Sequence, residues 1–261
     1  MRILFIGDIV GKPGRECLKD YLPEMKRTHH FDFIIANGEN AAGGAGMTEK
    51  TFVELRKIGI DLLTGGNHIW DQQDIFNFID RESGMLRPAN YPDDTTPGRG
   101  LGILVKKKGE KKLAVLNLIG RVFMKPADCP FRTADRELSK LGGETKNIII
   151  DFHAEATSEK QALGWYLDGR VSAVLGTHSH VQTADQRLLP RKTAYISDVG
   201  MTGLYDSILG VDKSGPLKRF TTLLPHSLKI SSGRQMINAV ILEIDDKTGT
   251  AVSIDRVFDI K

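Results

Sequence analysis

Five apolar runs of this sequence end on residue types that bind metals or transfer protons. The residues at these ends are Asp8, Glu39, Asn40, Asn67, His68, His153, His178 and His180. Four of the seven histidines of the chain are among them. Because ligands bind just beyond the carboxyl ends of strands in α/β sheets, five such ends would bring these side chains into one small volume.

The side chains at these ends favour a centre with two metal ions. Their donors are carboxylate oxygens, amide oxygens and imidazole nitrogens without a thiolate, a set that suits iron, manganese or zinc better than a soft metal or magnesium. All of these residues except His68 count as donors, which makes at least seven, whereas one tetrahedral ion needs about four. The surplus indicates two ions bridged by a carboxylate, and metals roughly 3.5–4 Å apart are typical of in-line displacement at phosphorus.

Two local patterns refine this hypothesis. His178 and His180 are separated by one residue, so both would face the same way in an extended segment. Asn37 and the glycines that follow Ala42 are interpreted as loop formers that let the backbone approach the centre closely.

The composition is that of an ordinary globular protein. The 261 residues, of which 40% are hydrophobic and 26% charged, are enough for one large domain or two small ones. No linker marks a second domain, so we expect a single domain over residues 1–261. The net charge of +3 is compatible with an anionic substrate but does not indicate a nucleic-acid scaffold.

The cysteines and the apolar segments predict a cytoplasmic location. Cys17 and Cys129 form no CxxC pair, which argues against a disulfide framework or a structural zinc site. The apolar run at the N-terminus is too short for a signal peptide, and no stretch approaches the roughly 18 apolar residues of a membrane helix. We therefore expect no membrane partner.

Apolar runs alternate with helical patterns over most of the chain. The first third predicts strands at 2–7, 31–36 and 60–65 and helices at 14–25, 48–59 and 71–82, with Thr48 as an N-cap. The remainder predicts two strands within 102–120, strands at 147–152, 171–176 and 193–198, a helix at 159–169 and a C-terminal hairpin. This order predicts one α/β domain with two packed sheets and helices outside.

Several motifs resemble those of the calcineurin-like metallophosphoesterase superfamily. The resemblance rests on GD at 7–8, GNH at 66–68, the isolated His153 and GTHSH at 176–180. GDIVGKPGR, IANGENAAGG, LTGGNHIWD, TPGRG, DFHAEATSEK, GTHSHVQTAD and ISDVGMTG resemble more closely the YmdB-like branch of bacterial phosphodiesterases, over nearly the whole chain. The resemblance implies a four-layer α/β/β/α sandwich of two mixed sheets flanked by helices, a di-iron centre and phosphodiesterase activity, including activity on 2′,3′-cyclic nucleotides such as 2′,3′-cyclic AMP.

The resemblance also implies a role for each residue at the strand ends. The ligands of one metal would be Asp8, Glu39, Asn40 and His180. The ligands of the other metal would be Glu39, Asn67, His153 and His178. His68, which is next to a ligand but is not one itself, would be the proton donor.

Two departures from the broader superfamily are shared with the YmdB-like branch. The usual Asp-x-His pattern is absent, because Asp8 is followed by Ile9 and Val10. A glutamate, Glu39, occupies the bridging position where an aspartate is usual. Both argue against a general phosphomonoesterase or a protein phosphatase. We expect Glu39 to bridge both cations, which would compensate its buried charge, and the amide oxygen of Asn40 to fill the position of the absent histidine.

The expected reaction is attack of a metal-bridging hydroxide on phosphorus, with His68 protonating the departing ribose oxygen. Two alternatives stay open: an RNA nuclease, and a regulatory or signalling protein whose metal site mainly serves partner control. Assays with 2′,3′-cyclic AMP and a structured RNA would separate the two enzymes. A metal-loaded protein that is inactive on every phosphodiester would favour the regulatory protein.

Three further segments carry weaker signals. Arg99 in TTPGRG either contacts the substrate phosphate or is a solvated turn residue. The segment KKKGEKK at 106–112 is better explained as a solvated hairpin tip than as an RNA contact. GDIVGKPG lacks the glycine spacing of a phosphate-binding loop and has Pro13 after the lysine, so we exclude that motif. We expect a small-molecule substrate, with RNA as an open alternative, and a homo-oligomer, either a dimer or a tetramer.

Overall fold

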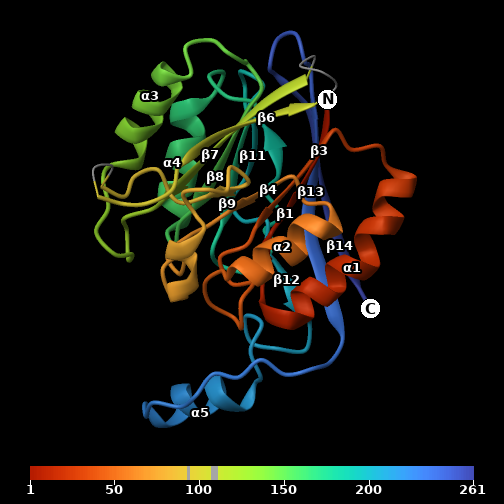
Figure 1. Ribbon diagram of the computed structural model, residues 1–261, viewed down its shortest axis with the longest axis vertical. Helices are drawn as coiled ribbons and strands as arrows, with labels where there is room; N and C mark the ends of the chain where they lie inside the picture. The colour runs from red at the N-terminus through yellow and green to blue at the C-terminus, as the bar shows by residue number, and fades with distance from the viewer. Residues whose placement is uncertain (93–94, 107–110) are drawn as a thin grey trace.

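Two mixed β-sheets lie face to face, and helices cover their outer faces (Figure 1). The structure is a computed structural model that describes residues 1–92, 95–106 and 111–261. Most of the basic segment 106–112, for which we predicted a hairpin tip, lies outside the described residues.

The first sheet contains eight strands in the order β2-β12-β13-β1-β3-β4-β5, with β14 beside β13. The strands are β1 (Arg2–Ile6), β2 (Asp8–Ile9), β3 (Phe33–Asn37), β4 (Leu62–Thr64), β5 (Met85–Leu86), β12 (Met201–Leu204), β13 (Gln235–Ile244) and β14 (Ala251–Ile260). β1, β3, β4 and β5 are parallel, whereas β13 is antiparallel to β1. The carboxyl ends of the parallel strands therefore lie at one edge of the sheet.

The second sheet contains six strands in the order β10-β11-β9-β8-β7-β6. The strands are β6 (Leu101–Lys106), β7 (Lys111–Ile119), β8 (Ile148–His153), β9 (Ala173–Thr177), β10 (Arg187–Leu188) and β11 (Ala194–Ile196). β7, β8, β9 and β11 are parallel. The antiparallel pairing of β6 with β7 confirms the two strands predicted within residues 102–120.

Helices cover both sheets and produce four layers. The helices are α1 (Gly11–Thr28), α2 (Glu49–Ile58), α3 (Pro130–Lys140), α4 (Thr157–Leu167) and α5 (Ser214–Thr222). α1 and α2 pack on the first sheet, and α3 and α4 pack on the second. α5 projects away from the rest of the molecule (Figure 1). The arrangement confirms the predicted α/β/β/α sandwich of two mixed sheets.

The alternation of side chains along β1 explains why the layers form. Leu4 and Ile6 pack in the apolar cluster beneath α1 and α2. Ile3 and Phe5 point the other way, into the cluster between the two sheets. Because successive side chains of a strand point to opposite faces, an uninterrupted apolar run predicts a strand that is buried on both faces.

Local chemistry sets the ends of α2. The hydroxyl of Thr48 accepts a hydrogen bond from the backbone N–H of Thr51 at 3.2 Å, which confirms the predicted N-cap. Gly59 ends the helix with a φ of 101°, in the left-handed region that favours glycine.

The helix predicted over residues 71–82 is wrong. The segment forms only a short 3-10 helix, Gln73–Asn77, followed by turns. Buried apolar residues at helical spacing suggested a helix, but two acidic side chains of the segment bond elsewhere. Asp71 lies 2.7 Å from the His68 ring, and Asp74 accepts a hydrogen bond from the first residue of α2. The first contact is local and the second is long-range, and together they stabilise a chain of turns instead.

The sequence predicted neither α3, α5 nor β12. In α3, Pro130 occupies the first turn, where its missing N–H costs nothing.

Within the part of the chain that the structure describes, no helix combines the length and the apolar composition needed to cross a membrane.

Candidate metal centre

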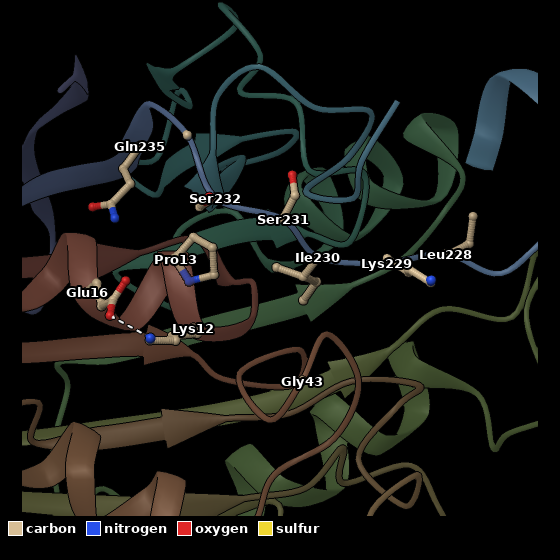
Figure 2. A pocket seen from close by; sticks show the side chains of 11 residues that line it. Lys12, Pro13, Glu16, Gly43, Leu228, Lys229, Ile230, Ser231, Ser232 and Gln235 are labelled. Atoms are coloured by element: carbon tan, nitrogen blue, oxygen red, sulfur yellow. Dashed lines mark ion pairs between the residues drawn. The ribbon is translucent and has the colours of Figure 1, made fainter. Parts of the chain in front are cut away.

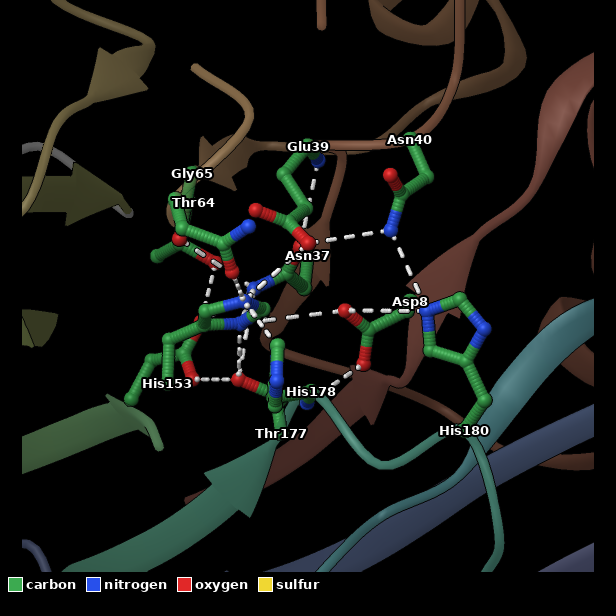
Figure 3. A network of polar contacts seen from close by, with 12 residues as sticks. Asp8, Asn37, Glu39, Asn40, Thr64, Gly65, His153, Thr177, His178 and His180 are labelled. Carbon is green, nitrogen blue, oxygen red and sulfur yellow. Dashed lines mark hydrogen bonds and ion pairs between the residues drawn. The ribbon is translucent and has the colours of Figure 1, made fainter. Parts of the chain in front are cut away.

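The predicted ligands meet at the carboxyl ends of strands from both sheets (Figure 3). Asp8 and Glu39 each lie two residues beyond the end of a strand of the first sheet, β1 and β3. His153 is the last residue of β8, and His178 follows β9 in the second sheet. The cluster therefore depends on the packing of one sheet against the other.

Glu39, His153 and His178 form a first ligand group, whose ligand atoms all lie within 4.8 Å of one another. Nε2 of His153 lies 3.0 Å from Oε1 of Glu39 and 3.0 Å from Nδ1 of His178. Oδ1 of Asn67 also lies 3.0 Å from Nε2 of His153. Donor atoms about 3 Å apart match the edge of a coordination shell with bonds of about 2.1 Å. The structure thus brings together the four residues predicted for one metal.

Asp8, Glu39 and His180 form a second ligand group by the same distance criterion. Nδ2 of Asn40 lies 3.0 Å from Oε1 of Glu39 and 3.1 Å from Nε2 of His180. Because a metal ligand must be the amide oxygen, metal binding here would require the Asn40 amide to turn over. Glu39 belongs to both groups, as the bridging prediction requires.

Burial and unsatisfied atoms show that this donor set fits metal ions. Asp8, Glu39 and His153 are at most 1% exposed, and buried carboxylates are costly unless they are paired or bind a cation. Oδ1 of Asp8 is buried and has no hydrogen-bond partner among the described residues. A cation in the second group would satisfy this oxygen.

The pKa values of Glu39, His153 and His178 also fit a cation in the first ligand group. Burial would raise the pKa of Glu39, but the neighbouring His153 outweighs it and lowers the pKa to about 2. Burial would lower the pKa of His153, but Glu39 outweighs it and raises the pKa to about 9. Without a metal, a proton therefore lies between Glu39 and His153, where a cation would bind. Burial and His153 lower the pKa of His178 to about 4, so His178 is neutral, as a ligand must be. Burial raises the pKa of Asp8 to about 6.

His68 lies at the rim of the centre. Its backbone N–H donates a hydrogen bond to Oε2 of Glu39 at 3.1 Å. Its side chain is 43% exposed, and Nδ1 lies 2.7 Å from Oδ2 of Asp71. Asp71, which the sequence analysis missed, orients the imidazole through Nδ1.

His178-Ser179-His180 forms a bend with left-handed backbone, here called the turn, so the extended segment in which the two histidines would face the same way does not form. The backbone φ is 103° at His178 and 65° at His180. A non-glycine residue in this left-handed region costs about 1–2 kcal/mol. His178 consequently points to His153 in the first group, and His180 points to Asn40 in the second. The alternation of side chains on which the prediction depended holds only for extended backbone.

A polar network beneath the first ligand group was also missed. The buried Asp151 carboxylate accepts hydrogen bonds from Asn37 Nδ2 at 3.0 Å, from Thr177 Oγ1 at 2.7 Å and from Thr64 Oγ1. Since the Thr177 hydroxyl donates to Asp151, its oxygen accepts from Nδ1 of His153 at 2.9 Å. This arrangement directs Nε2 of His153 to the ligand group. Asn37, which we interpreted as a loop former, is a member of this network.

The other two histidines of the groups are oriented in a similar way. Nε2 of His178 lies 2.9 Å from Oε2 of Glu155, which leaves Nδ1 facing the first group. Nδ1 of His180 lies 3.1 Å from the carbonyl oxygen of Leu209, which leaves Nε2 facing the second group. Outer hydrogen bonds of this kind fix the ring orientation of metal-binding histidines.

Gly43, the first glycine after Ala42, borders a surface pocket beside the start of α1 rather than the centre (Figure 2). Gly43 and Gly44 have φ values of 69° and 102°, so they do form a loop in the left-handed region that favours glycine. An added Cβ on Gly44, however, would meet the side chain of Ile230, not a ligand. Among the described residues, the pocket lining includes Gly43 and Ile230 but none of the predicted ligands.

A Gly66→Ala variant is expected to bind metal at least about tenfold more weakly than the unaltered protein. An added Cβ at position 66 would overlap Oε2 of Glu39 and Nε2 of His153. The measurement is a Mn²⁺ titration by calorimetry, with Gly233→Ala as the control, since a Cβ there meets only the end of the Leu204 side chain. Equal affinity in the two variants would contradict the expectation.

Comparison with known proteins places this site in a family. The family model for YmdB-like proteins matches residues 4–257. The chain belongs to the YmdB-like family. This YmdB-like chain is 54% identical over 257 residues to the Bacillus subtilis (strain 168) protein named "2′,3′-cyclic-nucleotide 2′-phosphodiesterase", and the match covers 98% of this chain and 96% of that protein. The family predicted from the sequence motifs is thereby confirmed.

Two solved structures are similar to the YmdB-like chain over its whole length. A protein from Thermus thermophilus is 42% identical, with a TM-score of 0.92 and full coverage of both chains. A protein described as a novel phosphatase, from Mycoplasma pneumoniae, is 30% identical, with a TM-score of 0.93 and coverage of 100% of this chain and 93% of that one.

Arg99 is the one predicted site residue that the structure does not bring to the ligand groups. Its side chain is exposed, its backbone forms an isolated β-bridge with Leu86, and its guanidinium lies 3.5 Å from the carbonyl oxygen of Asp80. Contact with a substrate phosphate stays a prediction.

Proposed function

We propose that this YmdB-like protein is a dinuclear-metal phosphodiesterase that hydrolyses 2′,3′-cyclic nucleotides. The observation that carries the proposal is the position of Glu39, whose carboxylate belongs to both ligand groups. One carboxylate shared by two groups of nitrogen and oxygen donors is what a pair of closely spaced cations requires. The name of the Bacillus relative supports the substrate class.

The proposed ligands follow the two groups. Asp8, Glu39, Asn40 and His180 would hold one cation, and Glu39, Asn67, His153 and His178 would hold the other. Iron is the proposed metal, with manganese or zinc as alternatives, since mixed imidazole and carboxylate donors suit all three. Two bound cations would neutralise the phosphate oxygens and lower the pKa of a water molecule to the neutral range.

His68 has the geometry of a general acid for this reaction. The hydrogen bond from its backbone N–H to Glu39 holds the backbone of His68 beside the centre. Asp71 holds Nδ1, so that a proton on Nε2 can pass to the departing ribose oxygen as its bond to phosphorus breaks. The partial exposure of the ring leaves room for a substrate at this side.

The proposal is tested by assays on metal-loaded protein with three substrates. We expect hydrolysis of 2′,3′-cyclic AMP and of bis-p-nitrophenyl phosphate, and much slower cleavage of a structured RNA. Faster cleavage of the RNA would favour a nuclease. Inactivity on all three, with two metals bound, would favour a regulatory protein.

An Asp71→Ala variant is expected to lower kcat about tenfold, which is part of the ~10²–10⁴ that a general acid contributes. Loss of the carboxylate frees the His68 ring without touching a proposed metal ligand. Metal content should therefore stay the same, and steady-state kinetics with parallel metal analysis measure both quantities. An unchanged kcat would show that His68 needs no orienting partner.

We further propose that residues 1–261 act as one cytoplasmic domain. Both sheets supply ligands to one centre, so neither half could form it alone. Cys17 and Cys129 are free thiols, which is consistent with a reducing compartment.

The proposed homo-oligomer, a dimer or a tetramer, is supported by exposed apolar side chains on and after α5. Leu217 is 54% exposed, Phe220 76% and Leu223 89%, and such patches mark interaction surfaces. A Phe220→Ser/Leu223→Ser variant is expected to elute as a smaller species than the unaltered chain in light scattering coupled to size exclusion. Identical masses would exclude this surface as the contact.

A further inference from the structure

The turn that separates His178 from His180 rests on a buried carboxylate. The backbone N–H of Ser179, the middle residue of the turn, donates a hydrogen bond to Oδ2 of Asp198 at 2.9 Å. Oδ1 of the same side chain accepts from the N–H of Gly200 at 2.8 Å. Asp198 is 1% exposed, so both carboxylate oxygens are engaged away from solvent.

Lys160 of α4 supplies the opposite charge. Its Nζ lies 2.7 Å from Oδ2 of Asp198, and its side chain is 4% exposed. The stem passes along Gly176, where an added Cβ would lie 3.1 Å from Cδ of Lys160. A buried ion pair adds little net stability, because removing both charges from water offsets most of the attraction. Its location directly beneath the turn therefore suggests a role in the geometry of the site.

The conformation of the turn shows what this role is. His178 and His180 both have left-handed φ values. Non-glycine residues keep this strained conformation only where the surrounding structure holds it. The N–H of His178 is held by Oδ2 of Asp8 at 3.2 Å, and the N–H of Ser179 is held by Asp198. If the turn relaxed to an extended segment, both imidazoles would face the same side, and one ligand group would lose its histidine.

We infer that Lys160 and Asp198 are positioning residues that keep His178 and His180 directed to different metal positions. The inference rests on the proposed dinuclear centre. Oδ2 of Asp198 binds Lys160 and Ser179 together, so the pair acts through the backbone of the turn. Replacement of the lysine leaves a buried carboxylate without its counter-charge, and the anchor of the turn weakens.

The test is Mn²⁺ binding to folded, metal-free protein, measured by calorimetry and by electron paramagnetic resonance. The unaltered protein is expected to bind two Mn²⁺ per chain and to give the spectrum of a coupled pair. Lys160→Met, which keeps most of the stem but removes the charge, is expected to bind at least one Mn²⁺ about 10–100-fold more weakly. The coupled spectrum is expected to disappear at Mn²⁺ concentrations that saturate the unaltered protein.

Two further variants separate positioning from general destabilisation. Leu167→Ala opens a cavity in the buried end of the same helix and should lower the melting temperature without changing Mn²⁺ affinity. The double variant Lys160→Met/Asp198→Leu replaces the ion pair by apolar groups, which is often tolerated by the fold. It should melt near the unaltered protein and still bind Mn²⁺ weakly, and it serves as the test if Lys160→Met does not fold.

Three outcomes decide the inference. If folded Lys160→Met or the folded double variant binds two Mn²⁺ with the affinity of the unaltered protein, the inference is overturned. An equal loss of affinity in Leu167→Ala would also overturn it, because the effect would then follow stability alone. If the unaltered protein binds fewer than two Mn²⁺, the proposed dinuclear centre fails, and the inference fails with it.

Discussion

A His68→Ala variant is expected to retain two metal ions, but its phosphodiesterase turnover should fall about 10²–10⁴-fold, which is the usual contribution of a general acid. Only the backbone of His68 touches the ligand groups, through the hydrogen bond to Glu39. That bond persists in alanine, so the metal positions stay intact. The imidazole, however, is the group beside the centre that could protonate a departing ribose oxygen.

The size of the loss should depend on the leaving group. A nitrophenolate leaves without protonation, so bis-p-nitrophenyl phosphate should be affected less than 2′,3′-cyclic AMP. His30→Ala, which removes an exposed histidine, is the matched control and should behave as the unaltered protein. Loss of metal from His68→Ala, or turnover equal to that of the control, would contradict the assignment.

A Glu39→Gln variant is expected to impair both metal positions at once and to lower turnover by roughly 10³ or more, since the metals carry most of the charge stabilisation. Oε1 of Glu39 lies 3.0 Å from Nε2 of His153 in the first group and 3.0 Å from Nδ2 of Asn40 in the second. A neutral amide of the same shape can neither compensate two cations nor bridge them. Metal analysis should give less than one ion per chain.

Glu54→Gln is the matched control for Glu39→Gln. Glu54 pairs with Arg15 at 2.9 Å and with Lys19 at 2.6 Å, and belongs to neither ligand group. Its substitution should leave metal content at two ions per chain. If Glu39→Gln lost only one of two metals, the carboxylate would serve a single position, and the bridging role would be wrong.

The sequence predicted the fold well where apolar runs were long. Runs such as FDFIIA and NIIIDF became buried strands because both of their faces pack in apolar layers. The segment 71–82 failed because its apolar spacing fits either a helix or a succession of turns. Two contacts decide between them. The contact from Asp74 to α2 is tertiary, and the local contact from Asp71 to His68 reaches back before the segment, so neither shows in the apolar pattern.

The candidate ligands were predictable because the carboxyl ends of parallel strands share one edge of a sheet. That rule places Asp8 beside Glu39 at one edge of the first sheet, whereas His153 reaches them only because the second sheet packs against the first. The orientation of the histidines could not be predicted in this way. The turn at His178 and His180 depends on left-handed backbone, which the sequence gives no reason to expect at non-glycine residues.

The residues that support the ligands were harder to find. Asp151 did have a signal, since a charged residue inside the apolar run NIIIDF is unusual unless a buried network satisfies it. Lys160 and Asp198 are 38 residues apart in the chain, and neither is unusual in its local context. Only the packing of α4 against the second sheet brings them under the turn.

The central claim is that each chain holds two metal ions bridged by Glu39 and uses them in phosphodiester hydrolysis. Elemental analysis of anaerobically purified protein, together with activity on 2′,3′-cyclic AMP in the same preparation, tests it most directly. We expect two metal ions per chain, with iron predominant, and activity that falls in proportion when the metal is removed. At full occupancy, a content of one metal or fewer per chain in active protein would exclude the bridged two-metal centre.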